Sequence, residues 1–346
     1  MAAGPRRPPL AARPLALSLG DPAGIGPEIV VKAWRALKDS GPAFFVVGDH
    51  DVLVAAAQSS APVRRVGSAD EALGLFSHAL PVMDLPLRAP VIAGKPCVDH
   101  AEMIVRWIET GVGLALSGAA GGLVTAPISK APLYEAGFRY PGHTEFVAAL
   151  TAGAPMAGPR GPVMMLTAAD LRTVLVTIHT PLAEAIAALT TDRIVEIGRV
   201  TAHALVQDFG VARPRLALAG LNPHAGEGGS LGREEIDIVA PAAMRLRAEG
   251  IDCSDPKPAD SLFHDEARAG YDAVICLYHD QALIPVKTID FWGGTNITLG
   301  LPIVRTSPDH GTGFALAGRG LARADSLIAA IRAAGDIAAR RAAVHP

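Results

Sequence analysis

The chain has 346 residues, of which 50% are hydrophobic and 19% charged, and its formal net charge is −3. These values fit one large or two medium globular domains. They exclude a strongly basic protein, so we expect no nucleic-acid partner and no membrane binding. No apolar run reaches transmembrane length. Residues 1–13, which we expect to be a disordered tail, lack the apolar core of a secretory signal.

Three cysteines, Cys97, Cys253 and Cys276, are spread along the chain. Their odd number and wide spacing fit neither a disulfide framework nor a zinc ribbon. We therefore expect a reducing, cytoplasmic location.

In the first half, short apolar runs alternate with helical patterns. We expect strands at 15–20, 43–48 and 121–125, and helices from Pro27, from Asp49, near 69–77 and over 99–117. Pro27 suits the first position of a helix, because its missing N–H would have no partner there. Gly24 and Gly26 match a dinucleotide-binding fingerprint only in part, so they do not predict a Rossmann fold.

The second half continues the same alternation. Strands are expected at 163–166, 172–178, 215–220 and 273–277, and helices from His143, from Thr191 (as the cap) to about 208, over 258–263 and over 326–339. A glycine-rich, irregular turn precedes the helix that carries Glu234 and Glu235. Together the two halves predict an α/β fold with a largely parallel sheet.

Three of the predicted strands are followed by a histidine: His179, His224 and His279. Each histidine alone is more often structural than a ligand. If the strands are parallel, however, their carboxyl ends meet at one edge of the sheet, where three imidazoles can hold a divalent ion. Asp280 and Asp260 are candidates to orient a ring, although Asp260 also suits a helix cap.

Lys287, Asn296 and Arg305 follow within thirty residues of His279 and resemble an anion clamp. Arginine offers a planar fork for phosphate or carboxylate, and lysine a point charge. The simpler interpretation is solvated charge on a loop. His143 and Thr144, at an expected helix start, are further candidates to contact the same ligand.

These motifs resemble one family over nearly the whole chain, from about residue 14 to 340. The matching stretches are GDPAGIGPEI, TAPISK, GHTEF, LNPHAGEGG, PADSLF, YHDQALIPVK, NITLGLP and RTSPDHGT. They resemble the 4-hydroxythreonine-4-phosphate dehydrogenase family of vitamin B6 biosynthesis, which is similar in fold to isocitrate and isopropylmalate dehydrogenases. The resemblance implies two α/β/α subdomains with a cleft between them. The first comprises 14–128 plus 306–346, and the second, with the metal site and dimer interface, comprises 129–305.

The resemblance also implies roles for individual residues. A divalent metal is held by His179, His224 and His279. These ligands are drawn from both chains of a homodimer with a shared active site, which we take as His179 and His224 from one chain and His279 from the other. The substrate contacts are His143, Thr144, Lys287, Asn296 and Arg305. Asp260 and Asp280 hold the site together, and either Lys287 or a metal-bound water takes the substrate's proton.

The implied activity is the oxidation of 4-phosphooxy-L-threonine at C3 by NAD or NADP. Decarboxylation to 3-amino-2-oxopropyl phosphate follows. Imidazole ligands favour zinc, with magnesium or cobalt as alternatives. Three other functions stay open: a paralogous dehydrogenase of 4-phospho-threonate or 4-phospho-erythronate, a phosphate acyltransferase of the same superfold, and a non-catalytic phosphate-binding module.

The sequence departs from the family pattern in two places. After His310 the family usually has an acid where this chain has Ala315, so whatever that acid contributes to cofactor binding or loop order is absent here. Thr295 stands where valine is usual. Neither change touches the candidate metal ligands or the anion clamp.

Overall fold

The computed structural model describes residues 13–344, so the tail expected at 1–13 lies, apart from Arg13, outside the described residues. The chain divides into two compact units. Unit 1 is Met1–Pro155 with Pro302–Pro346, and unit 2 is Met156–Leu301. Each unit has a β-sheet flanked by helices, which confirms the predicted α/β class. Among the described residues, no helix combines the length and apolarity needed to cross a bilayer.

The boundaries between the units differ from those expected at 128/129 and 305/306. Residues 129–155 belong to unit 1 because α6 (His143–Thr151) packs on α4 (Ala101–Leu116) and buries Phe146 and Val147. Residues 302–305 also belong to it, because β12 (Arg305–Pro308) pairs in parallel with β5 (Leu123–Thr125). The packing of α6 and the pairing of β12 therefore explain why both boundaries differ from the expected ones.

The sheet of unit 1 is parallel throughout, in the order β3-β4-β2-β1-β5-β12. Its central strands β1, β2 and β5 are largely apolar and fully buried, as expected for a parallel sheet covered on both faces. The elements of unit 1 are β1 (Leu15–Ser18), α1 (Gly26–Leu37), β2 (Phe44–Gly48), α2 (His50–Ala57), β3 (Val63–Arg65), α3 (Ala69–Leu75), β4 (Leu80–Asp84), η2 (Val98–His100), α4, β5, α5 (Lys130–Glu135), α6, β12 and α12 (Asp325–Val344).

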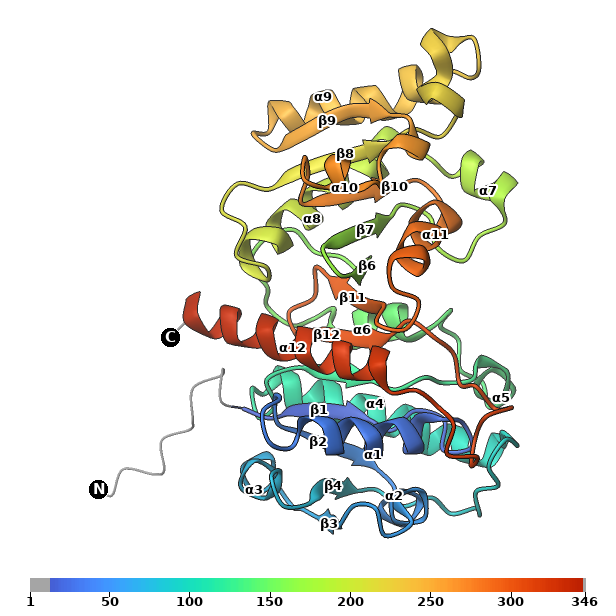
Figure 1. Cartoon of the computed structure of the whole chain (residues 1–346), viewed down its shortest axis with the longest axis vertical. Coiled ribbons are helices and arrows are strands. Elements are labelled where there is room, and N and C mark those ends of the chain that lie inside the picture. The colour runs from blue at the N-terminus through green and yellow to red at the C-terminus, as the bar shows by residue number, and fades with distance from the viewer. Residues whose placement is uncertain (1–12, 345–346) are drawn as a thin grey trace. The chain divides into compact units, whose positions relative to one another are not determined.

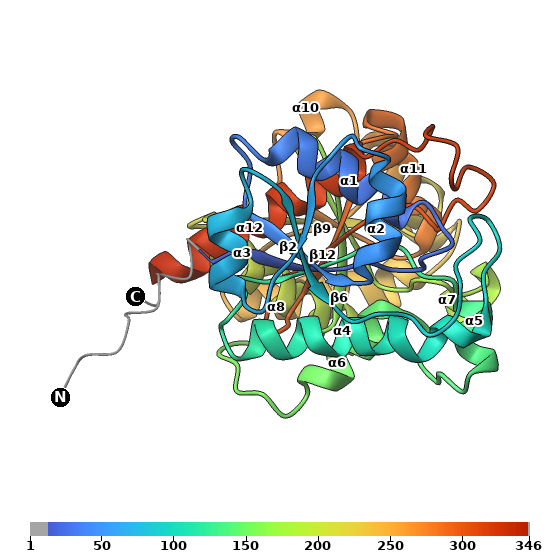
Figure 2. The same ribbon diagram turned by 90° about the horizontal axis from the view of Figure 1, so that it is seen from below.

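Helices cover both faces of this sheet. Figure 2 shows α4 and α6 on one face and α1 and α12 on the other. Helix α1 begins with Pro27 in its first turn, as predicted, and buries Ile29, Val30 and Trp34. The resulting α/β/α sandwich fixes the loops that follow the strands of unit 1.

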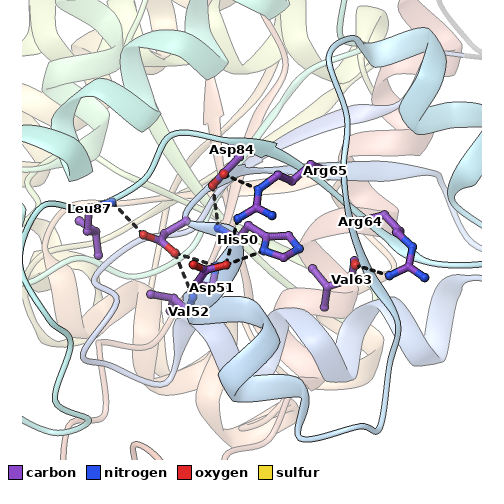
Figure 3. Close-up of polar contacts among 9 residues, drawn as sticks. His50, Asp51, Val52, Val63, Arg64, Arg65, Asp84 and Leu87 are labelled. Carbon is purple, nitrogen blue, oxygen red and sulfur yellow. Dashed lines mark hydrogen bonds and ion pairs between the residues drawn. The ribbon is translucent and has the colours of Figure 1, made fainter.

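The loop that follows β2 carries a group of charged side chains. Asp49 caps α2, because its Oδ1 accepts hydrogen bonds from the N–H groups of Asp51 (2.8 Å) and Val52 (3.0 Å). A cap of this kind stabilises a helix by about 1 kcal/mol. Beside it, Arg65 Nε on β3 donates to Asp84 Oδ2 on β4 at 2.6 Å (Figure 3). These polar groups tie the ends of neighbouring strands together, and we assign them a structural role.

The sheet of unit 2 is mixed, in the order β11-β6-β7-β10-β8-β9. Strands β11, β6 and β7 pair in antiparallel fashion, and β7, β10, β8 and β9 pair in parallel. The elements of unit 2 are β6 (Val163–Ala168), β7 (Leu171–Leu175), α7 (Leu182–Ala187), α8 (Thr191–Gln207), β8 (Arg215–Ala219), η3 (Pro223–Gly229), η4 (Glu235–Val239), α9 (Ala240–Ala248), β9 (Asp252–Lys257), η5 (Ala259–Ser261), α10 (Asp265–Arg268), β10 (Ala273–Cys276), α11 (His279–Ile289) and β11 (Thr295–Leu299).

Helix α11 covers one face of this sheet. Its Ala282 and Val286 join a buried cluster with Leu166, Leu175 and Val274 from β6, β7 and β10. Because the first residue of α11 is His279, this packing also fixes the start of the helix at the carboxyl end of β10.

Three expected details differ in the structure. Thr190, and not Thr191, caps α8: its side chain accepts from Arg193 N, whereas Thr191 Oγ1 donates to Ile238 O. The segment 258–263 holds only a 3₁₀ turn, and the last helix extends to Val344. Extended backbone at Thr190 lets its hydroxyl reach back to the first turn, which the helical Thr191 cannot do.

Candidate active site

The three histidines follow strands β7, β8 and β10, and these strands are parallel neighbours in the sheet of unit 2. Strand β10 lies in the middle, paired with β7 on one side and β8 on the other. Figure 1 shows the three strands side by side, with α7 and α11 following at the same end. The parallel arrangement on which the histidine hypothesis depended is therefore confirmed.

The register between β7 and β10 brings His179 and His279 together. Pairing continues beyond the strands: Val176 N donates to Cys276 O at 2.9 Å, and Thr177 Oγ1 donates to Leu277 O at 2.8 Å. The segments that follow β7 and β10 therefore keep the same register beyond the ends of the strands. The ring centres of His179 and His279 lie 5.6 Å apart.

The first turn of α11 orients His279. Its Nδ1 lies 2.7 Å from Asp280 Oδ1, the contact expected for a carboxylate that holds a metal-binding imidazole. A proton on Nδ1, donated to Asp280, would leave Nε2 as the nitrogen available to a metal ion. Gln281 anchors the same turn, because its Oε1 accepts from Leu277 N and its Nε2 donates to Gly220 O, both at 2.7 Å.

His179 and His279 line a cavity of about 340 Å³ together with Thr180, Leu182 and Tyr278. Two imidazoles that bind one zinc ion through nitrogens about 2.0–2.1 Å from it hold their ring centres roughly 5–6 Å apart. The observed separation of 5.6 Å satisfies this requirement. The pair and its supporting carboxylate therefore fit a divalent metal ion.

His224 is not part of this pair. It is exposed on η3, and within residues 13–344 of one chain no three His, Cys, Asp or Glu side chains gather closely enough to hold a metal. The sequence-based grouping placed His179 with His224 and took His279 from the other chain, whereas within one chain the structure brings His179 close to His279. Asp260 is exposed on η5, and its carboxylate makes no hydrogen bond to any of the three histidines in the described residues.

A second group of candidate residues gathers in unit 1 around Arg305. This side chain is only 2% exposed, and its guanidinium donates to Thr125 Oγ1 at 2.8 Å and to Thr144 Oγ1 at 3.5 Å. Burial lowers the pKa of Arg305 to about 10, and the Glu145 carboxylate opposes this change. The guanidinium is therefore still charged at neutral pH, and it is held in place by two hydroxyls.

His143 lies at the first position of α6, as predicted. Its Nε2 is buried and has no hydrogen-bond partner among the described residues. Burial, followed by the positive charges of Arg305 and Lys130, holds the pKa of His143 well below its ordinary value of 6.5. A neutral imidazole beside two cations suits an anionic ligand, because it adds a hydrogen bond without a third charge to desolvate.

The remaining clamp residues, Lys287 and Asn296, belong to unit 2. Asn296 lies on β11, and its Oδ1 is buried without a hydrogen-bond partner among the described residues. Lys287 lies on α11 with Nζ 5.1 Å from the ring centre of Phe291. A buried amide oxygen of this kind is a group that a polar ligand would satisfy.

Charge and spacing in the sequence do not predict three residues of these sites. Thr125 ends β5, Lys130 begins α5, and Gln281 is buried in the first turn of α11. Thr125 and Lys130 are the first and last residues of the TAPISK stretch, and Gln281 lies in the YHDQALIPVK stretch. Only these motifs signalled them, because a threonine or glutamine has no distinctive pattern by itself.

The low pKa of His143 predicts how this ring responds to pH. Its C–H proton resonances should not shift between pH 8 and 6.5, and Lys130→Gln should raise its pKa by removing a nearby charge. Because the folded pKa lies below the unfolded one, the neutral ring contributes stability above pH 6.5 that is lost as the pH falls towards the folded pKa. His143→Gln should weaken this dependence in denaturant titrations. An NMR pKa at or above 6.5 would contradict the assignment.

Comparisons with known proteins agree with this geometry. Residues 41–334 match the family model described as pyridoxal phosphate biosynthetic protein PdxA. A 4-hydroxythreonine-4-phosphate dehydrogenase from Caulobacter vibrioides is 67% identical over 332 residues, which cover 96% of this chain and 99% of the relative.

Solved structures point the same way. The crystal structure of the 4-hydroxythreonine-4-phosphate dehydrogenase from Klebsiella pneumoniae is similar, with a TM-score of 0.83 and 38% identity, over 94% of this chain and 99% of that one. A terephthalate 1,2-cis-dihydrodiol dehydrogenase from Burkholderia xenovorans is also similar, with a TM-score of 0.63 and 31% identity, over 94% of this chain and 98% of that one. The chain therefore belongs to the PdxA family of pyridoxal phosphate biosynthetic proteins.

Proposed function

We propose that the protein is a metal-dependent 4-hydroxythreonine-4-phosphate dehydrogenase of vitamin B6 biosynthesis. It oxidises 4-phosphooxy-L-threonine at C3 with NAD or NADP, and decarboxylation then gives 3-amino-2-oxopropyl phosphate. The observation that carries this proposal is the pair His179 and His279, at metal-binding distance, in a chain 67% identical over almost its whole length to a relative of that name.

The basic group of unit 1 supports binding of the phosphorylated substrate. Arg305 is buried, charged and held by two threonine hydroxyls, so its fork can grip an anion without losing side-chain freedom on binding. Neutral His143 and Thr144 add hydrogen-bonding groups, and in unit 2 Lys287 and Asn296 add others. We assign these five side chains to substrate contacts, and Lys287 also to the substrate's hydroxyl proton.

His179 and His279 would hold the divalent ion, and Asp280 would keep the ring of His279 in position. When bound, the ion supplies Lewis acidity at the hydroxyl that is oxidised and at the carbonyl that replaces it. The nicotinamide cofactor accepts the hydride. Imidazole ligands favour zinc or cobalt over magnesium.

The third ligand, in this proposal, is His224 of a second copy of the chain. Two features support a homodimer with a shared site. His224 is exposed and lies apart from the other two histidines. In addition, the helices that follow those histidines expose large apolar side chains, with Leu182 on α7 56% exposed and Ile284 on α11 63% exposed. Exposed apolar groups of this size are typical of protein interfaces.

The similar protein from Burkholderia xenovorans is named for a different substrate, a terephthalate dihydrodiol. A phosphate acyltransferase is disfavoured by the family match. A cytoplasmic location is part of the proposal, and it is consistent with Cys97, Cys253 and Cys276 being unbridged.

An activity assay tests the proposal directly. Purified protein with zinc or magnesium and NAD should form NADH from 4-phosphooxy-L-threonine, and a chelator should stop it. The same assay with 4-phospho-threonate and 4-phospho-erythronate should give a lower kcat/KM. A higher kcat/KM for either of these would identify the paralogous dehydrogenase, and no NADH with any of them would indicate a binding module.

Arg305→Lys should lower kcat/KM for the phosphorylated substrate by about 30- to 1,000-fold, because lysine cannot supply the fork of the guanidinium. Arg65→Lys is a matched control in the same unit: Arg65 is exposed and pairs with Asp84 on the surface, so its kcat/KM should change less than about twofold. Equal values for the two variants would show that Arg305 is not a substrate contact.

Mixing inactive variants tests whether the site is shared. If His179 and His279 come from one chain and His224 from the other, co-refolding His179→Ala with His224→Ala should yield about half heterodimers, each with one intact site. About a quarter of wild-type activity should return. Co-refolding His179→Ala with His279→Ala should restore none, because both lesions affect the same half-site. Recovery only in the second mixture would show that His179 and His224 come from one chain and His279 from the other. Recovery in neither mixture would contradict a shared site.

A further inference from the structure

The turn that carries His224, in the yellow region that follows β8 in Figure 1, has unusual backbone geometry. Five consecutive residues, His224 to Gly228, have left-handed φ angles between 45° and 81°. Glycine adopts such angles readily. His224, Ala225 and Glu227 each carry a Cβ and are strained there. Backbone strain of this kind persists only where surrounding contacts hold the segment.

The group that holds it is the carboxylate of Glu235. This side chain is 3% exposed. Its Oε1 accepts hydrogen bonds from Leu221 N and Asn222 N, both at 2.7 Å, and its Oε2 accepts from Asn222 Nδ2 at 3.0 Å. These donors lie immediately before the strained turn. A buried carboxylate that accepts hydrogen bonds from several N–H donors is costly to remove, because those donors would be left without partners.

The turn also closes onto this carboxylate from its other side. A side chain at Gly226 would place its Cβ 2.7 Å from Glu235 Oε2, so the left-handed backbone packs directly against the acid. Gly226 itself is buried and has a φ of +81°. Glu235 therefore contacts both the entry to the turn and its middle.

The helix that supplies Glu235 is irregular at this residue. Glu235–Val239 forms a π-helical turn before α9 begins at Ala240. Single π turns inside helices are rare and occur frequently at functional sites, since the wider turn redirects a side chain. Here the redirected side chain is the one that supports the His224 turn.

We propose that Glu235 is a positioning residue that presents His224 to the metal. This inference rests on the proposed function, in which His224 is the third metal ligand. Glu235 acts through the backbone: its carboxylate fixes residues 221 and 222, and the strained turn then projects the imidazole of His224 in a defined direction. Both carboxylate oxygens already accept hydrogen bonds from the chain, so Glu235 is a support and not itself a ligand.

The test is metal affinity, measured as Co²⁺ binding to the metal-free, full-length protein. Glu235→Gln keeps the shape and one acceptor, but it loses the charge and places an amide N–H₂ against Asn222 Nδ2. It should raise the Co²⁺ dissociation constant by about 10- to 100-fold, as expected when a supporting contact of a metal ligand is lost. The visible spectrum of bound Co²⁺ should also change. The unfolding midpoint in chelator reports structural damage separately, and a purely structural role would lower it without changing Co²⁺ affinity.

Glu234→Gln is the matched control. Glu234 is the adjacent acid and reaches Asn222 only through its side-chain amide. Its Co²⁺ dissociation constant should stay within about twofold of wild type, because the backbone of the turn is untouched. If Glu235→Gln does not fold, Glu235→Asp decides by the same criterion, since it keeps the charge but shortens the reach.

His224→Ala separates the two hypotheses. If it binds Co²⁺ as tightly as wild type, the metal role of His224 is wrong and the inference falls with it. If His224→Ala loses affinity while the Glu235 variant keeps it within twofold, the metal site stands and the positioning role of Glu235 is overturned.

Discussion

The parallel pairing of β10 with β7 is the constraint on which the chemistry of unit 2 depends. It aligns Leu175 with Cys276 and continues past both strands, so that His179 and His279 meet at one edge of the sheet. A shift of one residue in this register would turn every side chain of the strand to the opposite face. Buried residues on both faces of β10, such as Val274 and Ile275, make such a shift costly.

The third histidine is positioned by a strained turn and not by the register of the sheet. His224 follows β8, yet a strained left-handed turn carries it away from the other two. Such a turn needs support, and a single buried carboxylate from η4, the next helical element along the chain, provides it. The two halves of the proposed metal site are thus positioned differently. Sheet register places His179 and His279, whereas hydrogen bonds to Glu235 hold the turn that presents His224. A shared site requires that both halves be rigid before two chains meet, because neither chain alone gathers three ligands among its described residues.

In unit 1 the side chain that has to be stabilised is a buried cation, Arg305. Arg305 is almost fully buried, and Thr125, Thr144 and the charge of Glu145 offset part of its desolvation. Burial, followed by this same positive charge, holds the pKa of His143 well below its ordinary value. A basic site that includes one neutral ring is less costly to maintain without its ligand, and it still offers the donors that an anion requires. Thr125 and Arg305 lie on the neighbouring strands β5 and β12, and His143, Thr144 and Glu145 lie in the first turn of α6.

The sequence by itself determined the α/β class, most of the strands and helices, and the position of each histidine after a strand, because hydrophobic periodicity and turn residues act over short stretches. It also determined the family, because eight motifs in one order are specific. Only the tertiary structure decided that His179 pairs with His279 and not with His224, since strand order and register arise from contacts between segments a hundred residues apart. The same holds for Glu235 and Thr125. Their roles depend on which distant N–H groups or guanidinium they meet, and no local pattern encodes that.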